Sequence, residues 1–214
     1  MARDWESWLR TAAKPASDSE QQERDRTEAR IKAAITASNE LPATVKVYAK
    51  GSYANNTNVR RDADVDVAVE WTEEFKVLTW GATEGMTPQQ LGYTPVAQMI
   101  APAEFRAQVE RALFAAFGSA VDTSGDKAID VAAGTGTLDA DLVPCIQMWR
   151  YDAPNDYRVG HRLFPKSGGW IDNYQEHNLV NGRQKNKDTG GRYKDIVRAI
   201  KRVGCVNSIF LQID

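Results

Sequence analysis

The chain has 214 residues, 42% of them hydrophobic and 26% charged, a balance typical of one globular domain with a real core. Its formal net charge of -2 gives no argument for nucleic-acid binding, and its two cysteines and two histidines lack the number and spacing of a disulfide framework or a zinc site. The N-terminus shows no apolar signal segment and no apolar run is long enough to span a membrane, so we expect a cytoplasmic protein without membrane contact.

The first third of the chain is predicted to contain one long helix and two strands. Residues 17–20 form a capping box, Ser-Asp-Ser-Glu, that begins a polar, alanine-rich helix ending near Ser38. Residues 44–48 alternate in polarity and are rich in β-branched side chains, which predicts a strand. The same alternation returns over residues 64–71 and predicts a second strand.

The middle of the chain is predicted to hold a long insert, a helix and two more strands. Residues 72–102 contain Gly and Pro and are expected to form a loop with a short helix near Pro88. Residues 102–117 have the apolar spacing of an amphipathic helix. Residues 127–132 and the apolar segment 138–148 are predicted to be strands.

The last part of the chain is predicted to be a hairpin followed by a basic helix. Strands at 159–164 and 170–174 flank a turn that contains Pro and Gly. From Arg183 to Arg202 there are eight basic and two acidic residues. Apolar residues within this helix recur at helical spacing and are expected to form a buried stripe, namely Tyr193, Ile196, Val197, Ile200 and Val203.

The chemistry-bearing part of the sequence begins at Gly51-Ser52, directly after the first predicted strand. Gly51 can adopt a backbone conformation closed to other residues, which lets a phosphate approach the main chain closely. Ser52 can cap a short helix and offer its hydroxyl, and the free amides at a helix start attract anions. A Gly-Ser pair alone is common in loops, so it indicates a phosphate site only in combination with the acidic residues of the next strand.

Paired carboxylates occur at Asp64 and Asp66, in the second predicted strand. Residues two apart on a strand share a face, so both side chains project to the same side while the intervening valines enter a core. Carboxylate oxygens suit hard divalent cations, and a pair of such ions clamps the attacking and leaving oxygens of a phosphoryl transfer.

A third carboxylate is expected from the predicted strand at 138–148, which carries Asp139 and Asp141. A charge among apolar residues needs a partner, and a metal ion would be one. We favour Asp141 because it lies deeper in the apolar run, whereas Asp139 is expected at the rim. The sequence therefore predicts that Asp64, Asp66 and Asp141 are the catalytic and metal-binding residues.

Four segments of the chain resemble the bacterial CD-NTases, the cGAS/DncV-like nucleotidyltransferases, and are most similar to their E-clade: GSYANNTNVRRDADVDVAVEW from Gly51, DADLVPCIQMWRY from Asp139, GWIDNYQEHNLVNGRQKN from Gly169 and RYKDIVRAIKR from Arg192. The resemblance implies an α/β (α+β) fold with a mixed central sheet and a polymerase-β-like nucleotidyltransferase core. Residues 1–214 would form a single domain, with the catalytic core at 1–150 and the hairpin and basic helix at 151–214. Family members continue into a helical C-terminal lobe, so we expect the last helix to begin that lobe and the lobe to be truncated here.

The resemblance also implies a function. Such enzymes use two Mg²⁺ ions, with Mn²⁺ as an alternative, to make cyclic di- or trinucleotide signals from ATP and other NTPs. The product activates an effector in CBASS-type antiviral defence. Nucleotidyl transfer to a protein, RNA or small-molecule acceptor remains an alternative, because one fold hosts many activities. A truncated, non-catalytic nucleotide-binding protein is a further alternative.

Three more nucleotide-binding residues are expected from the resemblance. The family's long basic helix turns a lysine toward the triphosphate, and Lys194 is the best positional match, with Lys201 the next candidate. The segment matching the predicted hairpin lies over the nucleobase in the family. Asn173 has a donor and an acceptor with which to read a base edge, although an ordinary turn residue at a strand end remains an equal interpretation.

Overall fold

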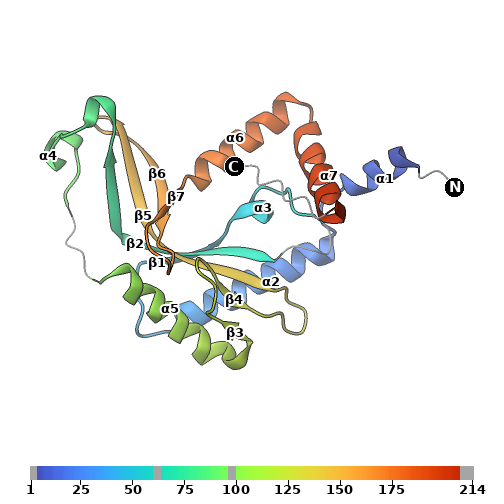
Figure 1. The fold of residues 1–214 in the computed structure, drawn as a ribbon, viewed down its shortest axis with the longest axis horizontal. Helices are drawn as coiled ribbons and strands as arrows, with labels where there is room; N and C mark the ends of the chain where they lie inside the picture. Colours follow the sequence, from blue (N-terminus) through green and yellow to red (C-terminus); the bar gives the residue numbers. More distant parts are fainter. Residues whose placement is uncertain (1–3, 60–63, 96–99, 208–214) are drawn as a thin grey trace.

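The computed structural model describes residues 4–59, 64–95 and 100–207, whose strands form one mixed sheet (Figure 1). The strands are β1 (Val45–Ala49), β2 (Val65–Thr79), β3 (Val121–Asp122), β4 (Ile129–Val131), β5 (Ala140–Ala153), β6 (Asp156–Leu163) and β7 (Ile171–Asn173). The α-helices are α1 (Trp5–Ala12), α2 (Asp18–Thr36), α3 (Gly51–Ala54), α4 (Pro88–Leu91), α5 (Pro102–Phe117), α6 (Gln175–Asp188) and α7 (Arg192–Asn207). Two 3₁₀ turns, η1 (Gly81–Thr83) and η2 (Gly118–Ala120), complete these elements. The α/β (α+β) prediction with a mixed sheet is confirmed.

The centre of the sheet is the pair β2 and β5, which run parallel, while the other strand pairs are antiparallel. β1 pairs with β2, whereas β4 pairs with the beginning of β5 and β6 with the rest of it. β3 and β7 lie outside β4 and β6. β2 and β5 therefore hold the sheet together: β1, β4 and β6 pair with one of them directly, and β3 and β7 are joined to them through β4 and β6.

The main core lies on one face of this sheet, under α2 and α5 (Figure 1). The apolar residues of both helices meet alternate residues of β2 and β5, and the group includes Ile31, Ile35, Phe105, Val109, Leu113, Val65, Val67, Val69, Leu142 and Ile146. Because side chains alternate along a strand, the intervening residues of β2 and β5 face the other side. That second face carries the acidic residues and lies on the same side as α3, α6 and α7 (Figure 1).

Both central strands are longer than predicted, so the expected loop over residues 72–102 is wrong for its first part. β2 continues to Thr79, and its pairing with β5 shifts register between Trp71 and Phe75 before it resumes. Residues 72–79 contain no Gly or Pro, and a local irregularity lets a strand continue where its alternation is broken. The short helix expected near Pro88 is confirmed as α4.

The buried apolar stripe predicted for the last helix is also wrong. Ile196 is 55% exposed in α7, and Ile200 and Val203 are 37% and 38% exposed. The helix instead turns Arg198 inward, where it is 4% exposed and donates hydrogen bonds to the carbonyls of Ala13 and Asn56. Helical spacing shows which residues share a face, but not which face meets the protein.

One helix is missing from the predicted elements. α6 is polar along its whole length and buries none of its residues. Without an apolar stripe, the helical period is not visible in the sequence. This helix connects β7 to α7 and so places α7 on the same side of the sheet as α3 (Figure 1).

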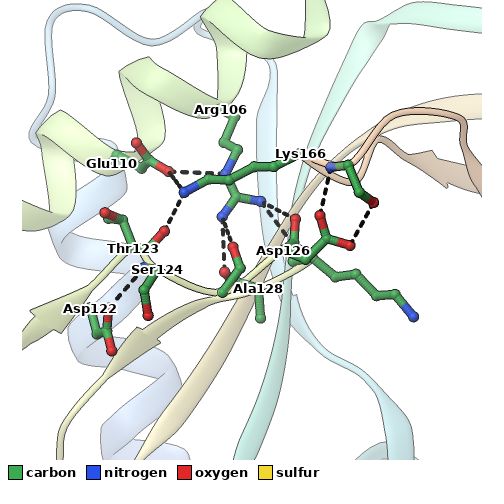
Figure 2. Close-up of polar contacts among 11 residues, drawn as sticks. Arg106, Glu110, Asp122, Thr123, Ser124, Asp126, Ala128 and Lys166 are labelled. Carbon is green, nitrogen blue, oxygen red and sulfur yellow. Dashed lines mark hydrogen bonds and ion pairs between the residues drawn. The ribbon is translucent and has the colours of Figure 1, made fainter.

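A buried arginine fixes the loop that leads into β4 (Figure 2). Arg106 of α5 is 7% exposed, and its guanidinium donates hydrogen bonds to four consecutive backbone carbonyls, those of residues 125–128, over 2.9–3.2 Å. It also pairs with Glu110 at 2.9 Å. On the other side of the loop, the Asp126 carboxylate accepts hydrogen bonds from the N–H and hydroxyl of Ser167. The path into β4 is therefore held by both α5 and the turn after β6.

We predict that Arg106→Met destabilises the protein by roughly 3 kcal/mol, because four backbone carbonyls and the Glu110 carboxylate lose the buried guanidinium that binds them. The measurement is the free energy of unfolding in urea. Arg111→Met on the same helix is the matched control, since Arg111 is half-exposed and pairs only with surface carboxylates. Equal unfolding curves for the two variants would contradict the role given to Arg106.

Candidate active site

The Gly-Ser turn lies directly against the first acidic strand. Gly51 has a φ of +66°, and a Cβ placed on it would lie 2.1 Å from Oδ2 of Asp66. The preceding residue, Lys50, donates its backbone N–H to the carbonyl of Asp66 at 2.8 Å. Glycine is therefore required at position 51 both by backbone conformation and by the carboxylate beside it. Ser52, half-buried, follows in the first turn of α3.

Three carboxylates lie side by side across three neighbouring strands. Asp66 on β2 is the register partner of Asp141 on β5, and Asp141 is the partner of Asp130 on β4. Directly opposed residues point to the same face of a sheet, so these side chains form one row. Asp64 lies just before β2 and is exposed. The structure thus places the predicted Asp66 directly beside Asp141, while Asp64 lies two residues before Asp66 in the chain.

Burial and like charges raise the pKa values of Asp64, Asp66 and Asp141. The pKa of Asp141 is raised to about 6, first by burial and then by the charges of Asp130, Asp64 and Asp66 together with a hydrogen bond to Asp130. Burial also raises the pKa of Asp66, against the opposing effect of Lys50 and Lys201. The pKa of Asp64 is raised by burial and by neighbouring carboxylates. Such mutual repulsion is the cost that a bound cation relieves.

Asp139 has a different environment from Asp141. Its side chain is exposed, and its Oδ1 accepts a hydrogen bond from the backbone N–H of Ala133 at 2.6 Å. Its carbonyl accepts from the N–H of Val65 at 2.8 Å. Asp139 therefore closes the turn before β5, outside the row of register partners.

The donors in this row fit a hard divalent cation. Over the described residues, no three acidic, histidine or cysteine side chains gather into a complete metal cluster. Mg²⁺ is usually held by one or two carboxylates together with substrate phosphates and water, and not by an all-protein cage. Asp66 and Asp141, directly opposed in register, offer such a pair, and the charges of Asp130, Asp64 and Asp66 act on Asp141.

The two predicted lysines of α7 have different surroundings. The charge of Lys201 acts on Asp66, so this lysine lies on the acidic side of the helix. Lys194 is half-buried, and its pKa is lowered by burial and by the charges of Arg183 and Arg198. Its backbone N–H donates to the side chain of Asn186 at 3.0 Å. Lys201 is therefore the one whose charge bears on the carboxylates.

Asn173 ends β7 beside a buried histidine. It is the register partner of His161 on β6, and its buried Oδ1 has no hydrogen-bond partner among the described residues. His161 is 2% exposed, and burial lowers its pKa to about 4. Within the part of the chain that the structure describes, its Nε2 also has no partner. The Asn173 oxygen is thus enclosed by protein, and an amide oxygen is a hydrogen-bond acceptor.

Sequence reasoning missed Asp130, Lys50 and His161. Asp130 is in a strand that was predictable, but only the pairing of β4 with β5 places it opposite Asp141. Lys50 adjoins the Gly-Ser pair, and its charge acts on both Asp66 and His161. The position of Lys50 just before Gly51 is a signal that could have been found.

Comparison with known proteins identifies the family, although no family model matches the chain. The chain is 39% identical over 206 residues to a cyclic dipyrimidine nucleotide synthase CdnE of Legionella pneumophila, an alignment that covers 95% of this chain and 69% of the relative. A CdnE of the same description from Cecembia lonarensis is 31% identical, over 95% of this chain and 68% of the relative.

A solved structure shows the same fold. The CdnE c-UMP-AMP synthase of Rhodothermus marinus, solved with Apcpp and Upnpp, has a TM-score of 0.79 and 29% identity, and the match covers 97% of this chain and 70% of that one. Among the described helices of the present chain, none combines the length and apolar character needed to cross a membrane. The chain belongs to the CdnE cyclic nucleotide synthases, nucleotidyltransferases of the CD-NTase family with a polymerase-β-like fold.

Proposed function

We propose that this chain uses Asp64, Asp66 and Asp141 to bind two Mg²⁺ ions, or Mn²⁺ in their place, and joins NTPs into a cyclic di- or trinucleotide. The observation that carries this proposal is the register of β2 and β5, which sets Asp66 directly opposite Asp141. Gly51 lies against the Asp66 carboxylate. Phosphate and cation sites are thereby adjacent, as nucleotidyl transfer requires.

The residues around the acidic row each have a role in this chemistry. Two bound Mg²⁺ ions supply activation of the attacking hydroxyl and neutralisation of the leaving pyrophosphate. Gly51 leaves its backbone open to phosphate, and the Ser52 hydroxyl donates a hydrogen bond to it. Lys201 and Lys194 on α7 neutralise the β and γ oxygens. The side chains thus hold the triphosphate between the sheet and the helix.

The base preference is proposed to include uracil. Asn173 ends β7 as the register partner of His161, and an amide can both donate to a carbonyl and accept from a ring N–H, which is the pattern of uracil. Relatives named cyclic dipyrimidine nucleotide synthase and cyclic UMP-AMP synthase agree with a pyrimidine at one position or both. The product would then activate a nucleotide-dependent effector in antiviral defence.

The direct test is incubation of the protein with each labelled NTP and Mg²⁺, followed by phosphatase. We expect a small labelled product that resists phosphatase, because a cyclic nucleotide has no terminal phosphate. A labelled protein or RNA would show transfer to another acceptor. Nucleotide binding without any product would favour a non-catalytic role.

Asp66→Asn and Asp141→Asn are each predicted to lower turnover by about a thousandfold or more, since several kcal/mol of charge stabilisation are lost. Asp139→Asn is the matched control and should retain turnover, because Asp139 lies outside the row of register partners and its Oδ1 accepts a hydrogen bond from the backbone N–H of Ala133. Initial rates and melting temperatures are measured together. Loss of activity in Asp139→Asn with activity kept in Asp141→Asn would reverse the assignment.

Gly51→Ala is predicted to abolish NTP binding, because the new methyl group would collide with Oδ2 of Asp66 in a backbone conformation that alanine disfavours. Ser52→Ala should lose roughly 1.5–3 kcal/mol, or about 10- to 100-fold in affinity. Affinity is measured with a fluorescent non-hydrolysable NTP. Gly85→Ala serves as the control, because Gly85 also has a positive φ but no atom lies within 4 Å of the added carbon. If Gly51→Ala bound nucleotide as tightly as this control, the phosphate-binding role of the turn would be excluded.

Asn173→Ser is predicted to change the preference for UTP over ATP by at least about tenfold, because serine cannot make both hydrogen bonds to uracil. Incorporation from each labelled NTP is compared in the two proteins. Asn178→Ser, on the exposed surface of α6, is the matched control. An unchanged base profile in Asn173→Ser would return Asn173 to the role of a turn residue.

A further inference from the structure

The acidic row continues beyond the predicted metal ligands. Asp130 on β4 is the register partner of Asp141, and its charge raises the pKa of Asp141. Its charge also acts on Asp64. Neighbouring strands are about 4.8 Å apart, so Asp130 lies one strand from Asp141 and two from Asp66. The side chain of Asp130 is exposed, which leaves it accessible from the same face.

The surroundings of β4 hold Asp130 in this position. Arg106 binds the four carbonyls of residues 125–128, which lead directly into β4 (Figure 2). The backbone N–H of Lys166 donates to the carbonyl of Asp126 at 3.0 Å, which adds a contact from the turn after β6. These contacts hold the backbone that leads to Asp130, so the position of Asp130 beside Asp141 is fixed by the fold.

The next acidic residue in the row, Asp122, uses its carboxylate in a hydrogen bond to the backbone. Asp122 on β3 is the register partner of Asp130, but its Oδ1 accepts a hydrogen bond from the backbone N–H of Ser124 at 2.8 Å (Figure 2). Asp122 therefore supports a local turn. It lies one strand further from Asp141 than Asp130 does, which makes it a matched reference for the effect of position.

We propose that Asp130 supports the cation site from beside Asp141: its negative charge strengthens divalent-cation binding, and its carboxylate does not contact the ion itself. This inference rests on the metal site of the proposed function. Groups that contact a metal-binding carboxylate contribute to affinity without binding the metal themselves, and their loss commonly weakens binding by 10-fold or more. Asp130 is thus a positioning and charge-supplying residue.

The test is titration of the whole 214-residue chain with Mn²⁺, read by the electron paramagnetic resonance signal of the free ion. We expect Asp130→Asn to weaken Mn²⁺ binding by about 10-fold. Asp130→Glu, which keeps the charge, should restore most of the affinity, and Asp122→Asn should change it by less than about twofold. Asp66→Asn is included as the variant that should lose the site. The melting temperature of metal-free Asp130→Asn should not fall, because the substitution removes repulsion beside Asp141.

The outcomes separate this inference from the proposed function. If Asp66→Asn loses Mn²⁺ while Asp130→Asn binds it like the wild type, the role of Asp130 is overturned and the metal site stands. If Asp66→Asn also binds like the wild type, the metal site itself is wrong, and the role of Asp130 with it. A lower melting temperature of metal-free Asp130→Asn, or failure of Asp130→Glu to restore binding, would show a structural role for Asp130 instead of a charge effect.

Discussion

The parallel pairing of β2 with β5 is the constraint on which the rest of the molecule depends. In one register it places Val65, Val67 and Val69 under α2 and α5 and, on the opposite face, Asp66 beside Asp141. Side chains alternate along a strand, so a slip of one residue would bury the carboxylates and expose the valines. The hydrophobic core therefore selects the register that assembles the acidic row.

The acidic row itself opposes folding. Each carboxylate that comes out of water beside another raises the free energy of the ionised state, which is visible in the raised pKa of Asp141. The apolar face of the same strands and the arginine-bound loop before β4 offset this cost. Proteins commonly tolerate an unfavourable interaction of this kind at a functional site, because the rest of the fold stabilises the structure around it.

Local features of the site could be predicted from the sequence, whereas features that depend on pairing could not. Gly51, Asp64 and Asp66 stand within one short segment, so their spacing places them together at the junction of a turn and a strand. The place of Asp130 depends on which strand lies beside β5, and nothing local specifies that neighbour. Arg198 shows the same limit, because a helix pattern does not identify the face that meets the protein.

The inward turn of Arg198 gives α7 a mechanical link to the beginning of the chain. Its guanidinium holds the carbonyl of Ala13, just after α1, and that of Asn56, in the segment after α3. Lys201 is less than one turn further along the same rigid helix, and its charge acts on Asp66. Tags or truncations at the N-terminus are therefore not neutral choices for this protein, since displacing α1 would tilt the helix that carries a lysine toward the carboxylates.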